Sequence, residues 1–549
     1  MSDPTPPIAR KQTHTSSWHG IQLSDDYHWL RAENWQEAMR DPARLPGDIR
    51  AHLEAENAYT QATMADTQKL QETLFQEMKG RIKEDDSSVP SPDGPWQYYS
   101  SFVTGGQYPL LCRRPRDGGD ESILLDGNQL AEGHAYWQLG GASHSPDHKL
   151  MAYATDTNGS EYYTIRIRDL ESGQDLADEI PATGGSVVWV RDSRTFYYIR
   201  LDDNHRPLDI YRHTLGTAPQ NDELVFHENN SGCYLGLGKT QSGAFILIDS
   251  SDPETNEVYL LDANDPSAKP RLVAARSDKH EYAVDHHGDQ LYILTNSGGA
   301  EDFRICTAPL TALGQEMGQE NWQELIPHSP GTLILSMVML KDHMVRLERA
   351  RSLPRIVIRR LADSTEHEIA FPEAAYSLSM SAGYEFETTN IRFSYTSMTT
   401  PAQVFDYDME TRDRILRKEQ EVPSGHTAAN YVTERIFVKA RDGADVPVSI
   451  LYRKETKRDG TAPLLLYGYG SYGISIPAGF STTRLSLVDR GFIFAIAHIR
   501  GGKEMGYRWY TDGKRDKKTN TFTDFIDCGE ALVAKGYTKR GRIVANGGS

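Results

Sequence analysis

The sequence lacks the features that mark secreted, membrane and metal-dependent proteins. Its four cysteines lie far apart and form no Cys-x-x-Cys pair, which argues against a disulfide framework and against a thiolate zinc site. The amino terminus has no basic-then-apolar signal pattern, and no run of about 18 apolar residues occurs. These absences predict a soluble, cytoplasmic protein with no membrane contact, no metal and no cofactor.

An excess of positive charge is also missing. The chain has 59 Lys and Arg residues against 77 Asp and Glu residues, a net charge of -18. This balance disfavours nucleic acid and anionic membranes as partners and favours cationic or peptide-like ones, although acidity also serves solubility. The length of 549 residues exceeds the size at which one hydrophobic core keeps growing, so we expect two or more domains.

The residue pattern divides the chain into three regions. Residues 1–75 are polar and mostly helical by pattern, and the helical periodicity is clearest between residues 46 and 78. Residues 76–423 consist of short β-type runs broken by Gly, Asp, Asn and Pro. Residues 424–549 alternate between apolar strands and helices, which predicts an α/β domain.

The β-rich region repeats one sequence pattern, in which a Tyr- or Ile-rich strand is followed by a polar turn and a second strand. Seven such units can be followed at a spacing of roughly 45 to 55 residues, which is the period of propeller blades. Their inner strands centre on Tyr98, Tyr153, Tyr197, Ile246, Tyr292, Val345 and Phe393. We expect an all-β seven-bladed propeller. Stacked β-sandwiches are the alternative, but a closed ring better protects its strand edges.

The last region has the element order of an α/β-hydrolase domain up to its nucleophile. It opens with a hairpin whose turn contains Asp442 and Gly443. A helix is expected at 521–535, and Thr521 and Asp524 suit its first turn. Buried strands of a parallel sheet are expected at residues 462–467 and 492–497, the second wholly apolar, and at the short, apolar-centred run 542–546.

The chain closes with Gly547-Gly548-Ser549, the first half of a Gly-x-Ser-x-Gly nucleophile elbow. In such an elbow the Ser occupies a sharp strand-to-helix turn, and the flanking glycines avoid a collision with that turn. A bare terminal tripeptide is also typical of a flexible tail. Its position directly after an apolar strand favours the elbow, with Ser549 as the candidate nucleophile.

The loop at 467–473 follows the strand from which this fold supplies its second oxyanion donor. Its three glycines let the backbone approach a substrate closely. A hydroxyl such as that of Tyr469 is able to donate to a developing oxyanion. Tyrosines that only pack on a rigid turn are the alternative, but the elbow favours the catalytic interpretation.

Several motifs in register resemble the prolyl oligopeptidase family of serine peptidases. The motifs shared with the family are 465–470 (LLYGYG), 498–506 (HIRGGKEMG) and 546–549 (NGGS). The motifs most similar to its oligopeptidase B branch are 27–31 (YHWLR), 79–88 (KGRIKEDDSS) and 467–473 (YGYGSYG). The resemblance covers essentially the whole chain.

This resemblance implies a propeller that caps an α/β-hydrolase domain, with the amino-terminal segment packed on the hydrolase. It also implies that Ser549 is the acylating nucleophile, that Tyr469 is an oxyanion donor, and that short basic peptides are cleaved after Arg or Lys. In this fold the triad runs Ser, Asp, His along the chain, so its Asp and His are expected after residue 549. We therefore expect the chain as it stands to be an incomplete hydrolase that is inactive alone.

Other candidate residues favour structural roles. His498 ends a buried strand, and Arg500 and Glu504 are predicted to tie their loop together. The Gly-Gly-Ser at 184–186 lies in a β-type run and lacks the following Gly and helix of an elbow. Two other functions stay open, namely a non-catalytic binding module built on the propeller and a prolyl-specific or acylaminoacyl-releasing peptidase. The sequence indicates no oligomeric state.

Overall fold

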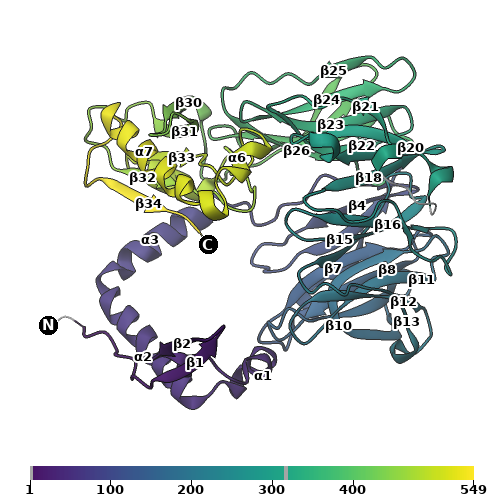
Figure 1. Cartoon of the computed structure of the whole chain (residues 1–549), viewed down its shortest axis with the longest axis horizontal. Helices are drawn as coiled ribbons and strands as arrows, with labels where there is room; N and C mark the ends of the chain where they lie inside the picture. The colour runs from purple at the N-terminus through teal and green to yellow at the C-terminus, as the bar shows by residue number, and fades with distance from the viewer. Residues whose placement is uncertain (1–3, 314–318, 549) are drawn as a thin grey trace.

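The structure is a computed structural model that describes residues 4–313 and 319–548. Figure 1 shows an amino-terminal segment, a large array of β-sheets and a smaller unit of mixed helices and strands. None of the helices in the described ranges is long and apolar enough to cross a membrane.

The amino-terminal segment begins with a hairpin and continues in helices. The hairpin pairs β1 (His14–Trp18) with β2 (Ile21–Asp25). Its side chains are almost all exposed on both faces, so the sequence has no two-residue apolar alternation that would predict strands. The three α-helices that follow are α1 (Trp35–Arg40), α2 (Gly47–Thr63) and α3 (Gln68–Lys79).

This segment contacts both of the larger parts. Directly after α3, Nη2 of Arg81 donates to Oδ2 of Asp489 in the α/β unit at 3.0 Å. In α1, Nε2 of Gln36 donates to the carbonyl oxygen of Asp203 in the β-sheet array at 3.1 Å. The segment therefore packs on the α/β unit at its end and bridges to the sheets at α1 (Figure 1).

The β-rich region forms six antiparallel sheets, of which five have four strands and one has seven. The strands of the four-stranded sheets are β3 (Ser91–Asp93), β4 (Trp96–Ser101), β5 (Leu110–Pro115) and β6 (Ser122–Asp126); β14 (Tyr234–Lys239), β15 (Phe245–Ser251), β16 (Asn256–Asp262) and β17 (Arg271–Leu272); β18 (Tyr282–His287), β19 (Gln290–Thr295), β20 (Arg304–Pro309) and β21 (Gln323–Ile326); β22 (Thr332–Met339), β23 (His343–Ala350), β24 (Leu353–Arg360) and β25 (Glu366–Glu368); and β26 (Tyr376–Ser381), β27 (Asn390–Ser397), β28 (Gln403–Asp408) and β29 (Arg414–Glu419). The strands of the seven-stranded sheet are β7 (Gln138–His144), β8 (Leu150–Asp156), β9 (Tyr163–Asp169), β10 (Asp175–Trp189), β11 (Thr195–Leu201), β12 (Pro207–Thr214) and β13 (Glu223–His227).

The sheets close into a ring. Each sheet shares a cluster of buried apolar side chains with the next one along the chain. The last sheet returns to the first, where Nη1 of Arg392 on β27 donates to the carbonyl oxygens of Val89 and Pro90 at 3.1 and 3.0 Å, just before β3. A ring of face-packed antiparallel sheets is a β-propeller, which leaves only short and protected strand edges.

The expectation of seven separate blades is wrong, because the structure has five four-stranded blades and one seven-stranded sheet. The cause is β10, a strand of 15 residues that pairs with β9 up to Thr183 and with β11 from Thr183 onward. The sequence units centred on Tyr153 and Tyr197 therefore belong to one sheet. Gly185, with a φ of 84°, bends β10 without ending it.

The α/β unit confirms the predicted order of elements. Its five-stranded sheet has the strand order β30-β31-β33-β32-β34, in which β33, β32 and β34 are parallel. All five residues of β33 are buried, as expected for a parallel strand covered on both faces. A short helix, α6, was not predicted. The elements are β30 (Tyr431–Lys439), β31 (Asp445–Arg453), β32 (Leu464–Tyr467), α5 (Thr482–Val488), β33 (Ile493–Ala497), α6 (Tyr507–Thr511), α7 (Thr519–Ala534) and β34 (Ile543–Asn546).

Candidate active site

The loops that carry the predicted site residues leave two neighbouring parallel strands at the same edge of the sheet. β32 and β34 pair with Tyr467 opposite Asn546. One residue further on, the backbone N–H of Gly468 donates to the carbonyl oxygen of Asn546 at 3.1 Å. The loop after β32 and the residues after β34 therefore lie side by side, at the carboxyl ends of strands where ligands of open α/β sheets bind.

The backbones of Gly547 and Gly468 lie close together. A Cβ on Gly547 would lie 2.8 Å from the carbonyl oxygen of Gly468, closer than real Cβ atoms come. The backbone around residue 547 therefore has no space for a side chain, which explains why the elbow pattern requires glycine at this position. A Cβ on Gly548 would have nothing among the described residues within 4 Å. Ser549, the predicted nucleophile, lies outside the described residues, and its role stays a prediction.

The side chain of Tyr469 is half-buried. Its loop is held in place by two residues at the start of α7, Lys518 and Thr521. Nζ of Lys518 donates to the carbonyl oxygen of Gly470 at 2.6 Å and to Oγ of Ser471 at 2.7 Å. Gly470 has a φ of 70°, and a Cβ there would lie 2.5 Å from Cγ2 of Thr521. A donor to an oxyanion has to be held in place before the reaction, and this loop is so held. The role of Tyr469 as that donor stays a prediction.

The loop after β33 is anchored by a buried ion pair, which agrees with the structural role expected for Arg500. Nη2 and Nε of Arg500 donate to the two oxygens of Asp524 at 2.6 and 2.8 Å, and Nη1 donates to Oδ2 of Asp442 at 2.5 Å. The hydrogen bond from Arg500 lowers the pKa of Asp442. The network joins the hairpin turn, the loop after β33 and helix α7.

Thr521 and Asp524 do not cap the first turn of α7, so that prediction is wrong. The helix begins at Thr519, and Oγ1 of Thr521 donates to the carbonyl oxygens of Arg500 and Gly513 at 2.8 and 3.1 Å. Asp524 accepts from Arg500 instead of from its own helix. A polar residue near a helix start is typical of a cap, and the sequence carries no separate signal for partners in another loop.

His498 and Glu504 also have structural partners, as predicted. Nε2 of His498 lies 2.9 Å from Oγ of Ser449, and Nδ1 lies 3.7 Å from Oε1 of Glu504. Glu504 accepts a hydrogen bond from the backbone N–H of Ile476 at 3.1 Å. Both side chains are buried, so they stabilise the loop after β33 from the interior of the protein.

A cavity of about 430 Å³ opens between the loop of Tyr469 and the propeller. Ser471 and Tyr472 line it on the α/β side. Asp252, Glu254 and Asp278 line it on the propeller side, and basic residues from both sides complete its wall. The cavity has room for part of a peptide and offers charges of both signs.

A propeller joined to an α/β sheet, with a glycine-rich loop and with Gly547 and Gly548 at its strand ends, defines a propeller-capped α/β-hydrolase. A family model described as "Prolyl oligopeptidase, N-terminal beta-propeller domain" matches residues 6–420, and one described as "Prolyl oligopeptidase family" matches residues 478–549. The chain belongs to the prolyl oligopeptidase family of serine peptidases.

Comparisons with curated proteins and with solved structures agree with this family assignment. The chain is 40% identical to dipeptidyl aminopeptidase BI of Pseudoxanthomonas mexicana, over 99% of this chain and 76% of the relative. It is 31% identical to protease 2 of Moraxella lacunata, over 99% of this chain and 77% of the relative. Oligopeptidase B of Leishmania major superimposes with a TM-score of 0.92 at 32% identity, over 99% of this chain and 78% of that structure.

Proposed function

We propose that the protein carrying this sequence is a serine oligopeptidase that cleaves short peptides after Arg or Lys. The observation that carries the proposal is the contact of Gly468 with Gly547, which sets the loop of Tyr469 beside the segment leading to Ser549. Similarity to protease 2 and to oligopeptidase B supports a peptide substrate, whereas cleavage after Arg or Lys rests on the motif resemblance given above. The net charge of -18 also favours a basic peptide over an acidic one.

In the proposed reaction, Oγ of Ser549 attacks the carbonyl carbon of the scissile bond and gives its proton to a histidine base. The Tyr469 hydroxyl donates a hydrogen bond to the oxyanion that forms. The amine leaves with a proton from the same histidine, and water then hydrolyses the acyl-enzyme. In the α/β-hydrolase order the Asp and His of the triad follow the nucleophile, so none of the 18 histidines in this sequence is assigned as the base.

Reporter hydrolysis by the full-length protein tests the proposal. We expect kcat/KM for Arg and Lys reporters to exceed that for a matched Pro reporter by about 100-fold or more, because a charge-reading site rejects a substrate that lacks the charge. Ser549→Ala should abolish turnover, and a polypeptide limited to residues 1–549 should match that background. Preference for the Pro reporter would support a prolyl peptidase and contradict the proposal.

A second candidate is the release of dipeptides from free amino termini. The 40% identity to dipeptidyl aminopeptidase BI favours it. Two peptides of one sequence, one with a free and one with a blocked amino terminus, separate the two activities. Cleavage of the blocked peptide supports the oligopeptidase, whereas cleavage of only the free peptide, two residues at a time, supports the dipeptidyl aminopeptidase.

All four cysteines are unpaired and buried in the described structure, at Cys112, Cys233, Cys306 and Cys528. Unpaired thiols are typical of reducing compartments. We therefore propose a cytoplasmic location. Fractionation of cells, with detection of the protein by antibody, tests it.

A further inference from the structure

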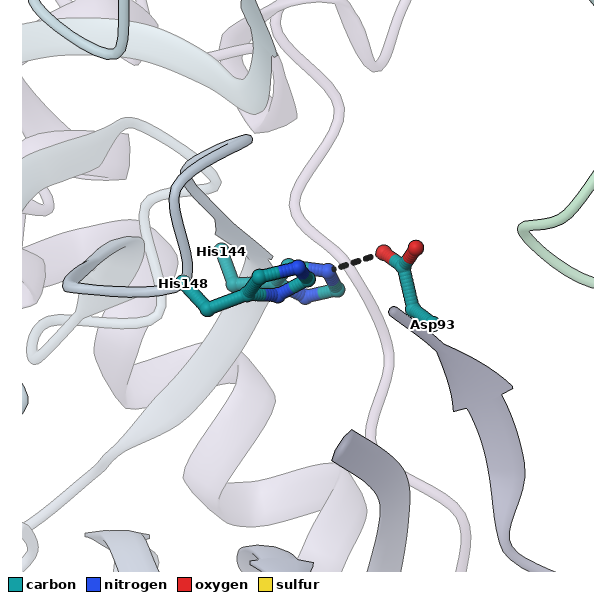
Figure 2. Close-up of side chains that lie close together, drawn as sticks. All are labelled: Asp93, His144 and His148. Atoms are coloured by element: carbon teal, nitrogen blue, oxygen red, sulfur yellow. Dashed lines mark hydrogen bonds and ion pairs between the residues drawn. The ribbon is translucent and has the colours of Figure 1, made fainter. Parts of the chain in front are cut away.

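Three metal-ligating side chains meet between the first two sheets of the propeller. Asp93 ends β3, His144 ends β7, and His148 lies in the turn that follows β7. Their ligand atoms all lie within 4.8 Å of one another, and Nε2 of His144 lies 2.7 Å from Oδ2 of Asp93. Figure 2 shows the two imidazole rings side by side, with the carboxylate of Asp93 directed at them.

Tyr98 orients both imidazoles. Its hydroxyl is 2.9 Å from Nδ1 of His148, and its ring stacks on that of His144 with the centroids 3.9 Å apart. Because Nδ1 of His148 has this partner, Nε2 is the nitrogen left for a ligand. A Cβ on Gly94 would lie 2.9 Å from this Nε2, so the atom faces the turn directly after Asp93.

The turn that carries His148 is fixed by its own hydrogen bonds. Oγ of Ser145 donates to Oδ1 of Asp147 at 2.6 Å, and the backbone N–H of His148 donates to the carbonyl oxygen of Ser145 at 2.9 Å. Nη1 of Arg113 donates to the carbonyl oxygen of His148 at 2.5 Å. The backbone at His148 is therefore held in place by contacts other than those of its ring.

We propose that Asp93, His144 and His148 form a zinc site, with water as the fourth ligand. Two imidazoles and one carboxylate are a common donor set for Zn²⁺, whereas Mg²⁺ and Ca²⁺ prefer oxygen ligands. Ligands at the usual zinc distances lie about 3.3 Å apart in a tetrahedron, so the three side chains need only small movements. When Zn²⁺ binds Nε2 of His144, the proton that this nitrogen donates to Asp93 has to leave it: a neutral imidazole then carries its one proton on Nδ1, and an imidazolium keeps the proton on Nδ1 and releases the other to solvent.

Two further properties fit a bound cation. Tyr98 acts as the outer partner that fixes a ligating histidine. The ion would join β3 of the first sheet to the turn after β7 of the second, and so stabilise the contact between the two sheets.

Equilibrium dialysis of the untagged full chain against ZnCl₂, followed by metal analysis, tests the site. We expect about one Zn²⁺ per chain in the unaltered protein and loss of that equivalent in His148→Ala and in the isosteric Asp93→Asn. Tyr98→Phe should weaken binding by about 10- to 100-fold, the usual effect of removing an outer partner. His134→Ala alters an exposed histidine and should bind zinc as the unaltered protein does.

Thermal unfolding with and without ZnCl₂ gives an independent readout. Zinc should raise the melting temperature of the unaltered protein and of His134→Ala but not of Asp93→Asn. Circular dichroism shows whether each variant is folded, and Asp93→Asn and Tyr98→Phe keep the shapes of the original side chains. Absence of a saturable zinc equivalent in the unaltered protein, or equal binding by folded Asp93→Asn, would overturn the proposal.

Discussion

The carboxylate of Asp524 is completely buried and faces the guanidinium of Arg500, whose side chain is 7% exposed. Asp524 accepts three hydrogen bonds from this one residue, two from the side chain and one from the backbone N–H at 3.0 Å. The pair connects α7 to the loop after β33, and Thr521 on the same helix contacts the same loop. The position of the site loops therefore depends on α7 as much as on the strands.

We expect Asp524→Asn to lower the free energy of unfolding by about 3 to 5 kcal/mol, because it leaves a buried guanidinium without its main partner. The matched control is Glu530→Gln on the same helix, whose pair with Arg540 at 3.5 Å is exposed. An exposed pair contributes about 1 kcal/mol or less. Urea denaturation of both variants measures the difference. Equal effects would mean that burial does not set the strength of the Arg500 pair.

Tyr469→Phe tests the proposed oxyanion donor. In the full-length protein we expect kcat to fall by about 100- to 1,000-fold with little change in KM, because the hydrogen bond forms only as the oxyanion develops. Tyr234→Phe is the control, since Tyr234 lies in β14 of the propeller, outside the proposed site, and is 50% exposed. If both variants lose activity equally, or if Tyr469→Phe raises only KM, Tyr469 is not the donor.

The sequence predicts those parts of this fold that are determined by residues close together in the chain. The Asp442-Gly443 turn specifies the hairpin of β30 and β31 through residues that are adjacent in the chain, and Gly443 has the φ of 91° that such a turn requires. The continuous apolar runs of β32 and β33 predict buried parallel strands, which the structure has.

The parts that the sequence did not predict depend on partners far away in the chain. The blade count failed because β10 changes its partner strand at Thr183 without ending, although Pro181 and Gly185 beside it are residues typical of a turn. The sequence pattern predicts that Asp524 belongs to a helix start, because its partner Arg500 lies 24 residues away in another loop and leaves no local signal. Asp93 and His144 are 51 residues apart, so no motif connects them before the propeller brings them together.

Gly547→Ala tests whether the close approach of Gly547 to Gly468 positions Ser549, the proposed nucleophile. The added Cβ would lie 2.8 Å from a backbone oxygen, so the segment leading to Ser549 has to shift. A displacement of about 1 Å at a reacting group costs on the order of 100-fold in rate, and we expect a loss of this size in kcat. Gly548→Ala, where an added Cβ would meet none of the residues that the structure describes within 4 Å, should lose less. An equal or greater loss in Gly548→Ala would contradict this steric explanation.

His213 in β12 gives the propeller a predictable pH dependence. Its ring is completely buried, with Nδ1 2.7 Å from Asp222 and Nε2 2.9 Å from Asp178. Burial alone would lower the pKa of His213, but the hydrogen bonds to the two carboxylates outweigh burial and raise it. A raised pKa means that the folded state binds the proton more tightly than the unfolded state does.

The stabilisation from His213 is therefore complete below the unfolded pKa of about 6.5 and is lost as the pH rises through the raised value. Urea denaturation at a series of pH values should show the free energy of unfolding falling over this window, and His213→Gln should flatten the fall. His134→Gln, at an exposed histidine, should keep the slope of the unaltered protein. If His213→Gln keeps that slope as well, the loss of stability at high pH comes from other groups and the imidazolium does not stabilise this sheet.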